Sequence, residues 1–376
     1  MEWKEDVLGN VLEVKYGKDH KKLADGQYPV YGSGGLMRYV DSKLYDGPSI
    51  LIPRKGTLNN IMFVESPFWT VDTMFWSIIN TDKVDPKFLF YSICKRDFAS
   101  MNVGSAVPSM TVNILNDIQI SYPKNIEDQR RIASILSSLD RKIELNNKIN
   151  ADLEEMAQAI FKNWFVDFEP FKDGKFVDSE LGMIPEGWKV GRLTEIASYM
   201  NGLAMQKFPP ENNEDSLPVL KIKELGQGFC GPDSDRCSCN IKDECKIHNG
   251  DVIFSWSGTL LVDVWCGGDC GLNQHLFKVT SKDYPKWFYY YWTKHHLQEF
   301  IHIAKDKAVT MGHIKRGHLE EAMVAILDND SMEKAHELFE PILSKMISLR
   351  LENSRLSLLR DTLLPRLMSG ELEVPE

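Results

Sequence analysis

The sequence predicts an α+β fold in which two mixed domains are joined by two long helices that form an antiparallel coiled coil. Three observations support this class. The chain has 376 residues, more than a single compact core usually holds. Its two halves share short matching phrases in the same order, which is typical of an internal repeat. Each half ends in a long stretch whose apolar residues recur at alternating steps of four and three. We therefore expect a pseudo-twofold internal repeat.

The matching phrases keep nearly constant offsets along the chain. Trp3-Lys4 recurs as Trp188-Lys189, an offset of 185, and Gly56-Thr57 recurs as Gly258-Thr259, an offset of 202. The helical stretches that follow match at an offset of 203. An ordered set of offsets that drifts only where loops differ in length indicates a duplicated unit.

Each half is expected to begin with a mixed domain. In the first, short β-rich runs at 49–52 and 118–122 flank a helical stretch near 87–99. In the second, strands near 252–254 and 323–327 flank a helix near 286–303. The expected boundaries are 1–127 for the first mixed domain, 128–168 for the first long helix, 169–187 for a linker, 188–330 for the second mixed domain, 331–370 for the second long helix and 371–376 for a tail.

The long helices are predicted from one apolar seam each. The first seam comprises Ile132, Leu136, Leu139, Ile143, Asn146, Asn150, Leu153, Ala157, Ile160 and Trp164. The second comprises Ala335, Phe339, Ile342, Met346, Leu349, Asn353, Leu356, Arg360, Leu363 and Leu367. A helix of about 38 residues would be ~57 Å long. Because a helix with one apolar stripe must bury it, each is the natural partner of the other.

The direction of the pair is a hypothesis drawn from the repeat. An antiparallel arrangement places two repeats about a pseudo-twofold axis. If seam positions whose numbers sum to 499 face each other, Asn146 meets Asn353. Two facing amides can satisfy one another and help to fix register and direction. We therefore predict a contact between these two side chains.

Four local phrases, in this order, resemble those of the type I restriction–modification specificity subunit family. They are Tyr28-Pro29-Val30-Tyr31-Gly32-Ser33-Gly34-Gly35, then Tyr122-Pro123 followed by Asp128-Gln129-Arg130-Arg131-Ile132-Ala133, then Ile184-Pro185-Glu186-Gly187-Trp188, and finally Leu363-Leu364-Pro365-Arg366-Leu367-Met368-Ser369-Gly370-Glu371-Leu372. The resemblance covers nearly the whole chain. It implies that both mixed domains are target-recognition domains and that the helices are spacers between them.

The resemblance also implies function and partners. A subunit of this family performs no chemistry and needs no cofactor. Each recognition domain reads one half of a split, asymmetric site in double-stranded DNA. The subunit binds two DNA methyltransferase subunits and, in the full complex, two motor-nuclease subunits. Flexible linkers would allow many distances between the two recognition domains, whereas paired helices can hold one fixed distance between the half-sites.

Charge and hydropathy limit the possibilities further. The net charge is −10, and residues 1–127 carry 14 basic and 15 acidic side chains against 16 and 19 in residues 188–330. Phosphate contacts should therefore be local rather than extensive. The charged start Met1–Asp6 is unlike a signal peptide, and no apolar run approaches the ~20 residues of a membrane helix. A cytoplasmic protein without a membrane partner is expected.

Base reading requires polar side chains in loops, such as Arg or Lys for guanine and Asn or Gln for adenine. The first domain offers Arg54, Lys55, Asn59 and Asn60. The second offers Ser257, Thr259, Asn273, Gln274, Lys305, Lys307, Lys315 and Arg316. The aromatic run Phe288–Trp292 is expected to be core, because its members recur at helical spacing.

Two other functions stay open at this point. Pro232-Asp233 with Glu244 and Lys246 fits the short pattern of metal-dependent nucleases, in which two carboxylates hold Mg²⁺. A protein-binding scaffold without a DNA role is compatible with nearly neutral domains. Cys237, Cys239, Cys245 and His248 could hold zinc, but no Cys-x-x-Cys pair exists and the spacing fits no common zinc site. No metal is expected.

Overall fold

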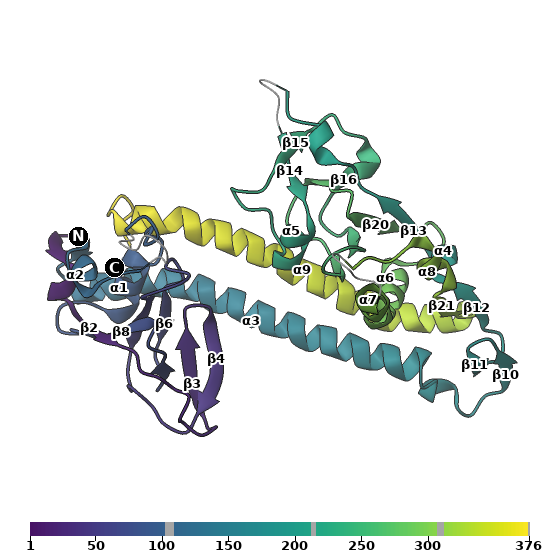
Figure 1. The fold of residues 1–376 in the computed structure, drawn as a ribbon, viewed down its shortest axis with the longest axis horizontal. Coiled ribbons are helices and arrows are strands. Elements are labelled where there is room, and N and C mark those ends of the chain that lie inside the picture. The colour runs from purple at the N-terminus through teal and green to yellow at the C-terminus, as the bar shows by residue number, and fades with distance from the viewer. Residues whose placement is uncertain (102–108, 212–215, 307–311, 375–376) are drawn as a thin grey trace. The chain divides into compact units, whose positions relative to one another are not determined.

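The computed structural model, drawn in Figure 1, describes residues 1–101, 109–211, 216–306 and 312–374. It divides into two compact units, which are described separately. Unit 1 comprises Met1–Ile143 with Leu356–Glu376, and unit 2 comprises Glu144–Arg355. Two continuous helices, α3 (Ile126–Phe165) and α9 (Asn329–Met368), contribute residues to both units. The α+β class is confirmed.

Unit 1 is built mainly from two small sheets. One has the strand order β2-β8-β5-β6 and the other the order β4-β3-β7, in which β3 and β7 run parallel. A separate antiparallel pair joins β1 to β9. The elements are β1 (Trp3–Val7), η1 (Leu8–Asn10), β2 (Leu12–Tyr16), β3 (Tyr28–Gly32), β4 (Gly35–Val40), β5 (Ser49–Pro53), β6 (Met62–Val64), β7 (Trp69–Thr70), β8 (Met74–Ile79), α1 (Pro86–Ile93), α2 (Val112–Asn116) and β9 (Gln119–Pro123).

Unit 2 begins with the second half of α3 and a hairpin, and then repeats the plan of unit 1. Its first elements in chain order are η2 (Glu169–Phe171), β10 (Phe176–Ser179), β11 (Gly182–Pro185), β12 (Lys189–Arg192), α4 (Leu193–Ile196), β13 (Ser198–Asn201), η3 (Met205–Lys207), β14 (Ser216–Leu220), α5 (Ile222–Gln227), β15 (Arg236–Ser238), η4 (Asp243–Cys245) and β16 (Lys246–Ile247). The remaining elements are β17 (Val252–Ser255), β18 (Leu261–Val264), β19 (Cys270–Leu272), β20 (Leu276–Thr280), α6 (Lys286–His295), α7 (Leu297–Asp306), α8 (Arg316–Glu321) and β21 (Met323–Ile326).

The internal repeat is confirmed by strand order. The sheet β13-β20-β17-β18 repeats β2-β8-β5-β6, and the pair β12–β21 repeats β1–β9. The sheet β15-β14-β19-β16 repeats β4-β3-β7 and adds one strand, and the parallel pair of β3 with β7 recurs as β14 with β19. The predicted single helix near 286–303 is wrong in detail, because the structure breaks it into α6 and α7.

The long helices begin and end at related positions. Asn125 accepts a hydrogen bond from the Glu127 amide at 3.0 Å, and Asp328 accepts one from the Ser331 amide at 2.8 Å. These side chains satisfy amides that have no partner within the helix, so both helices begin two residues before the predicted positions 128 and 331. They end before Phe168 and Gly370, whose φ angles of 51° and 76° do not continue a helix. The predicted ends at 168 and 370 were therefore too late.

Each unit has its own apolar core on one face of a long helix. In unit 1, Ile132 and Leu136 of α3 join a cluster with Phe88 of α1. In unit 2, Phe165 of α3 and Phe339 of α9 join a larger cluster that includes the aromatic run of α6. All five residues Phe288–Trp292 are buried, so their prediction as core is confirmed. Among the described residues, no helix has both the length and the apolar character that a membrane span requires.

Candidate nucleic-acid interface

Three loops meet at one place in unit 1. They follow β5, join β7 to β8, and precede α2. The Arg54 amide donates to the Thr73 carbonyl at 2.8 Å, and the Met110 amide donates to the Arg54 carbonyl at 2.9 Å. Lys55 and Ser109 form a β-bridge beside these bonds. The loops are therefore joined by main-chain groups, which leaves side chains in this region available for other contacts.

The same main-chain bonds recur in unit 2. The Trp256 amide donates to the His275 carbonyl at 3.4 Å, and the Ile314 amide donates to the Trp256 carbonyl at 3.0 Å. Ser257 and His313 form the matching β-bridge. The structure therefore repeats the frame of the three-loop cluster while the side chains on that frame differ. We call these two places the loop cluster of unit 1 and the loop cluster of unit 2.

A glycine supports each loop cluster. The amides of Gly17 and Gly202 donate to the carbonyls of Met74 and Leu276 at 2.9 and 3.1 Å. A Cβ atom would lie 2.0 Å from the Val71 carbonyl oxygen in the first case and 2.2 Å from the Leu272 carbonyl oxygen in the second. Only glycine permits so close an approach, which explains why this residue recurs in the two halves of the sequence.

The candidate residues of unit 1 fall into two groups. The Arg54 guanidinium lies 5.5 Å from the centre of the Tyr16 ring and donates to the Asp72 carbonyl at 3.3 Å, and Lys55 is exposed. Asn59 donates to Asp97 at 3.2 Å and also accepts from the Ala99 amide at 2.9 Å. Asn60 donates to the Ser33 carbonyl at 2.8 Å. The two asparagines therefore shape the loop, and Arg54 and Lys55 are the better placed to reach a ligand.

The loop cluster of unit 2 adjoins a pocket of about 610 Å³. Two of the candidate residues, Asn273 and Gln274, lie in its wall. Asn273 accepts from the His275 amide at 3.2 Å, and the two ring nitrogens of His275 lie 3.3 Å from Ser257 Oγ and 3.3 Å from Gln274 Nε2. The structure thus brings Ser257, Asn273 and Gln274 together around one histidine. Side chains of this kind can donate to and accept from base edges.

The sequence analysis missed the basic part of this pocket. Lys221, Lys223 and Arg236 also line it. Lys221 pairs with Asp235, and Arg236 donates to Ser216 Oγ at 2.9 Å. Lys221 directly follows β14 and Lys223 lies in α5, at a position that corresponds to the turn after β3 in unit 1. His275 was also missed, although it directly follows Asn273-Gln274.

The remaining candidates of unit 2 do not line this pocket. Thr259 and Lys305 are exposed, and Lys315 is exposed where its amide donates to His318 Nδ1 at 3.1 Å to begin α8. Arg316 lines a different pocket of about 540 Å³ with Glu195 and Asp283. Lys307 lies outside the described residues.

The residues of the nuclease and zinc hypotheses do not assemble a metal site in the described part of the chain. Asp233 and Glu244 are exposed, and Lys246 pairs with Asp243 at 2.8 Å. Cys237 and Cys245 are buried in an apolar cluster, where burial raises the pKa of both thiols and so disfavours the thiolate that binds metal. Among the described residues, no three His, Cys, Asp or Glu side chains group closely enough to hold an ion.

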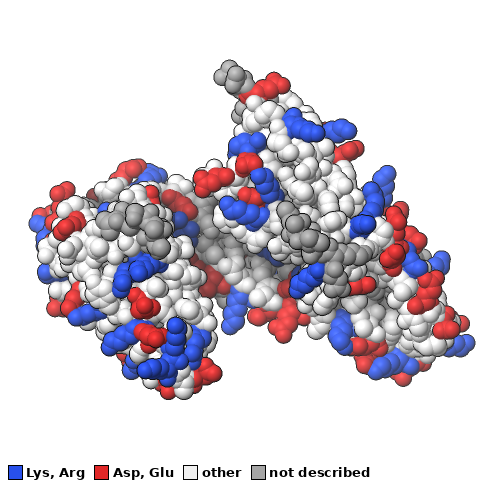
Figure 2. Space-filling view, in the orientation of Figure 1, with Lys and Arg blue, Asp and Glu red and all other residues white. Residues whose placement is uncertain are grey.

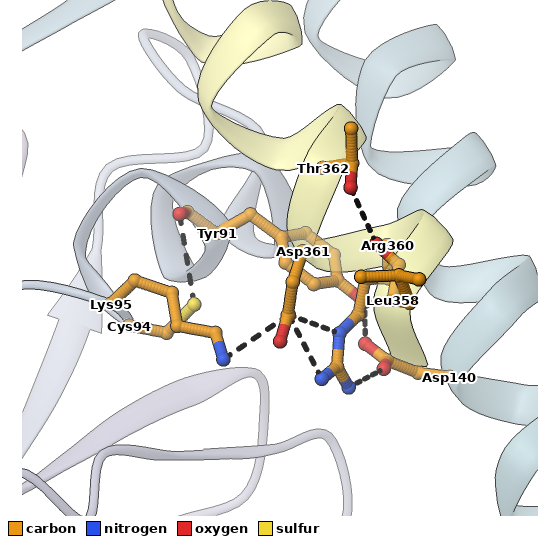
Figure 3. A network of polar contacts seen from close by, with 8 residues as sticks. All are labelled: Tyr91, Cys94, Lys95, Asp140, Leu358, Arg360, Asp361 and Thr362. Carbon is orange, nitrogen blue, oxygen red and sulfur yellow. Dashed lines mark hydrogen bonds and ion pairs between the residues drawn. The ribbon is translucent and has the colours of Figure 1, made fainter. Parts of the chain in front are cut away.

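A polar network joins α1 of unit 1 and the turn after it to α3 and α9 (Figure 3). Tyr91 of α1 donates to Asp140 of α3 at 2.5 Å, and Arg360 of α9 donates to the same carboxylate at 2.7 Å. Lys95 pairs with Asp361 at 3.2 Å. Burial, followed by the bond to Asp140, raises the pKa of Tyr91 above its ordinary value, so the phenol remains a donor. We call these five residues the junction network.

Unit 2 has polar contacts between its own helices and strands. Asn146 donates to Asn353 Oδ1 and to Glu352 Oε2, both at 2.8 Å. The contact expected between Asn146 and Asn353 is thus present. Arg350 of α9 donates to Asp263 at 2.7 Å, and Lys294 of α6 pairs with Glu154 of α3 at 2.6 Å.

None of the predicted seam side chains is exposed. Those that are buried are Ile132, Leu136, Asn146, Ala157, Ala335, Phe339, Met346, Leu349 and Leu367. Those that are half-buried are Leu139, Ile143, Asn150, Leu153, Ile160, Trp164, Ile342, Asn353, Leu356, Arg360 and Leu363.

Surface charge is mixed on the face drawn in Figure 2. Lys and Arg side chains alternate with Asp and Glu over both units, and one group of basic side chains covers the end of unit 1 near β3 and β4. Any phosphate contact on this face would therefore be local.

Comparisons with known proteins agree on one family. A family model described as the type I restriction modification DNA specificity domain matches residues 1–155 and 185–326. The MjaIX specificity subunit of a type I restriction enzyme from Methanocaldococcus jannaschii is 29% identical over 95% of this chain and 86% of its own length. The HindI specificity subunit from Haemophilus influenzae is 24% identical over 83% of each chain. The crystal structure of a type I restriction–modification S subunit from M. genitalium has the same fold, with a TM-score of 0.58, 15% identity and coverage of 97% and 96%.

Proposed function

Because the chain belongs to the type I restriction–modification DNA specificity family, we propose how its two units divide the reading of DNA. The chain is a specificity subunit, and the catalytic groups of such a system lie in partner subunits. In our proposal, residues 1–127 and 188–330 are two target-recognition domains. Each reads one half of a split, asymmetric site through its own loop cluster.

One observation carries this proposal. The two loop clusters share their main-chain hydrogen bonds but not their side chains. In the first cluster Arg54 and Lys55 can donate to guanine or to phosphate. In the second, Asn273, Gln274 and His275 present both donors and acceptors beside Lys221 and Lys223, and Ser257 lies against the His275 ring. Two domains that recognise different DNA sequences require the same main-chain arrangement with different polar side chains, and the two loop clusters have this combination.

The second part of the proposal concerns spacing. We propose that α3 and α9 form an antiparallel coiled coil through the predicted seams and that this pair sets the distance between the half-sites. The hydrogen bond that Asn146 donates to Asn353 supports it, because a buried polar contact between two seam positions favours one register. Half-sites on one face of DNA lie about 34–36 Å apart or at multiples of that distance, so a stiff spacer selects one separation.

The third part concerns partners. We propose that the subunit assembles with two methyltransferase subunits and two motor-nuclease subunits. The family membership supports this, since specificity subunits of type I systems act within such assemblies. The apolar side chains that remain exposed on the helices, among them Leu145, Met156 and Leu358, offer contact area for other proteins.

The test is modification profiling of DNA from cells that carry the chain with its methyltransferase and motor subunits. We expect one bipartite methylated sequence. Lys55→Ala should relax or change one half of that sequence and leave the other intact. Gln274→Ala with His275→Ala should do the opposite, so each variant serves as a control for the other. Methylation without any sequence preference would refute the reading function, and a change in both halves from one variant would refute the division of labour.

A further inference from the structure

The hairpin of β3 and β4 carries a bulge at its tip. Tyr31 pairs with Leu36 and Val30 pairs with Arg38, so Met37 has no partner across the hairpin. A bulge of this kind re-aims neighbouring side chains and bends the strand. β4 is also the edge strand of its sheet. The bulge therefore lies on the strand at the edge of this sheet.

Large apolar side chains gather at this tip. Leu36 is 52% exposed and Met37 is 56% exposed, although they are adjacent in the chain. Tyr39, on the same strand, is 48% exposed. The Met37 sulfur lies only 2.6 Å from the point where a Cβ of Gly32 would stand, so the glycine makes room for the methionine across the hairpin. Exposed apolar groups gathered in this way usually mark a contact surface.

The tip adjoins the loop cluster of unit 1. Ser33, in the turn between the two strands, accepts a hydrogen bond through its carbonyl from Asn60 at 2.8 Å. Its hydroxyl lies 2.9 Å from the position that a Cβ of Gly56 would occupy. Asn60 and Gly56 belong to the loop that carries Arg54 and Lys55. A ligand held by that loop therefore lies beside Leu36 and Met37.

Basic side chains stand in the same part of unit 1. Lys18, Lys21 and Lys22 are exposed, and within the described residues none of them forms an ion pair. The group of Lys and Arg side chains near β3 and β4 is visible in Figure 2. These three lysines favour a polyanion as the occupant of this surface, and an apolar tip beside basic groups suits the unstacked bases of DNA.

We propose that Leu36 and Met37 form an apolar wedge that inserts into one base step of the half-site read by the first domain. The proposal rests on the proposed function and adds deformation of DNA as a source of its specificity. Flexible pyrimidine–purine steps unstack most easily, so the wedge would select such a step without any hydrogen bond to its bases. Among the described residues, β15, which matches β4, carries no such apolar pair: Arg236 is exposed, and Cys237 and Ser238 are buried.

The probe is a duplex that carries the bipartite sequence methylated by the full complex, with 2-aminopurine placed singly along the half-site of the first domain. Unstacking raises the fluorescence of this base. With the complete complex, we expect a several-fold increase at one position that is not the methylated base. With Leu36→Ala/Met37→Ala the increase should disappear, and binding should weaken by about tenfold or more, since two large apolar side chains lose their burial.

The matched control is Leu181→Ala/Met183→Ala. These residues are 37% and 55% exposed on the hairpin of β10 and β11, so the control removes similar apolar surface from a similar element. It should leave both the fluorescence and the affinity unchanged. A second measurement uses the unaltered protein: a mismatch at the responding step should tighten its binding, because part of the unstacking has already occurred, and the wedge variant should show no such gain.

The outcomes separate this proposal from the proposed function. If the wedge variant retains both the fluorescence increase and the affinity, the wedge is refuted while the methylated bipartite sequence still supports DNA reading. If the variant instead loses its methyltransferase subunits, the hairpin is a protein contact and the wedge is again refuted. If the complex methylates no bipartite sequence, the proposed function itself fails.

Discussion

At the scale of single residues, the pair Asn146 and Asn353 provides a direct test of the helix register. Asn146 is fully buried, and its amide donates to Asn353. Asn146→Leu leaves the Asn353 carbonyl without this donor and should lower the free energy of unfolding by about 1–3 kcal/mol. The double variant Asn146→Leu/Asn353→Leu should recover most of that loss, because two apolar side chains then face each other. Urea unfolding followed by helical circular dichroism measures both. If the loss of unfolding free energy in the double variant equals the sum of the losses in the two single variants, the two amides act independently.

A second prediction at this scale concerns the glycines that support the loop clusters. In Gly202→Ala the new methyl group would stand 2.2 Å from the Leu272 carbonyl oxygen, so β13 and β19 must separate. We expect a loss of about 1–3 kcal/mol in the free energy of unfolding and relaxed reading of one half-site. Gly226→Ala is the control: it lies in α5 with nothing within 4 Å of the new methyl group, and it should be neutral or stabilise by up to about 1 kcal/mol. Thermal unfolding measures the change in stability of both variants, and modification profiling measures the change in the methylated sequence. Equal behaviour of the two variants would contradict the prediction.

At the scale of elements, the junction network predicts an acid dependence for the attachment of α1 to α9. Partial burial alone would raise the pKa of Asp361, but the bonds from Arg360 and Lys95 outweigh it and hold the pKa below the ordinary value of 3.8. A carboxyl group with a lowered pKa stabilises the folded state above pH 3.8, and that stabilisation is lost as the pH falls through the folded-state pKa. Unit 1 should therefore lose stability in this acidic range. In Asp361→Asn this part of the dependence should be absent, which unfolding curves at several pH values can show. An unchanged pH profile in the variant would contradict the assignment.

The long helices also show what a linear pattern can and cannot predict. The heptad pattern located both helices to within three residues of their observed ends. It did not show which flanking residues face a domain core, and Leu343 and Leu364 are more deeply buried than the predicted seam neighbours Ile342 and Leu363. A helix that packs against both a second helix and a domain core buries two stripes of side chains. In the sequence the two stripes overlap, so the pattern alone does not show which residue belongs to which contact.

The candidate site was predictable only in part for a similar reason. Asn273 and Gln274 were predicted from their polarity in a matched loop, whereas Lys221 and Arg236 were not. These basic residues reach the pocket because β14 lies between β15 and β19 in one sheet. That neighbourhood depends on strand order, which side-chain chemistry in the sequence does not encode. The roles of Asn59 and Asn60 likewise depended on partners, Asp97 and Ser33, that lie far away in the chain.

At the scale of the whole molecule, the spacing proposal predicts a graded change in the recognised site. Seven residues inserted after Ile143 together with seven after Leu356 keep the heptad pattern in both helices and lengthen each by ~10.5 Å. The methylated sequence should then keep both halves and gain about three base pairs between them, given ~3.4 Å per base pair. The same insertion in one helix alone should abolish methylation, since the seams no longer match. Profiling that returns the original spacing in the double insertion would rule out the helices as the spacer.

The main-chain origin of the loop clusters has an evolutionary consequence. Bonds such as those of Arg54 with Thr73 and of Trp256 with His275 join amides to carbonyls and so persist when the side chains mutate. Each cluster can accumulate substitutions without losing its fold, and it can do so independently of the other. A lineage could thus acquire a new methylation pattern by drift or recombination in one half of the gene. The other half of the gene would continue to specify the inherited half-site.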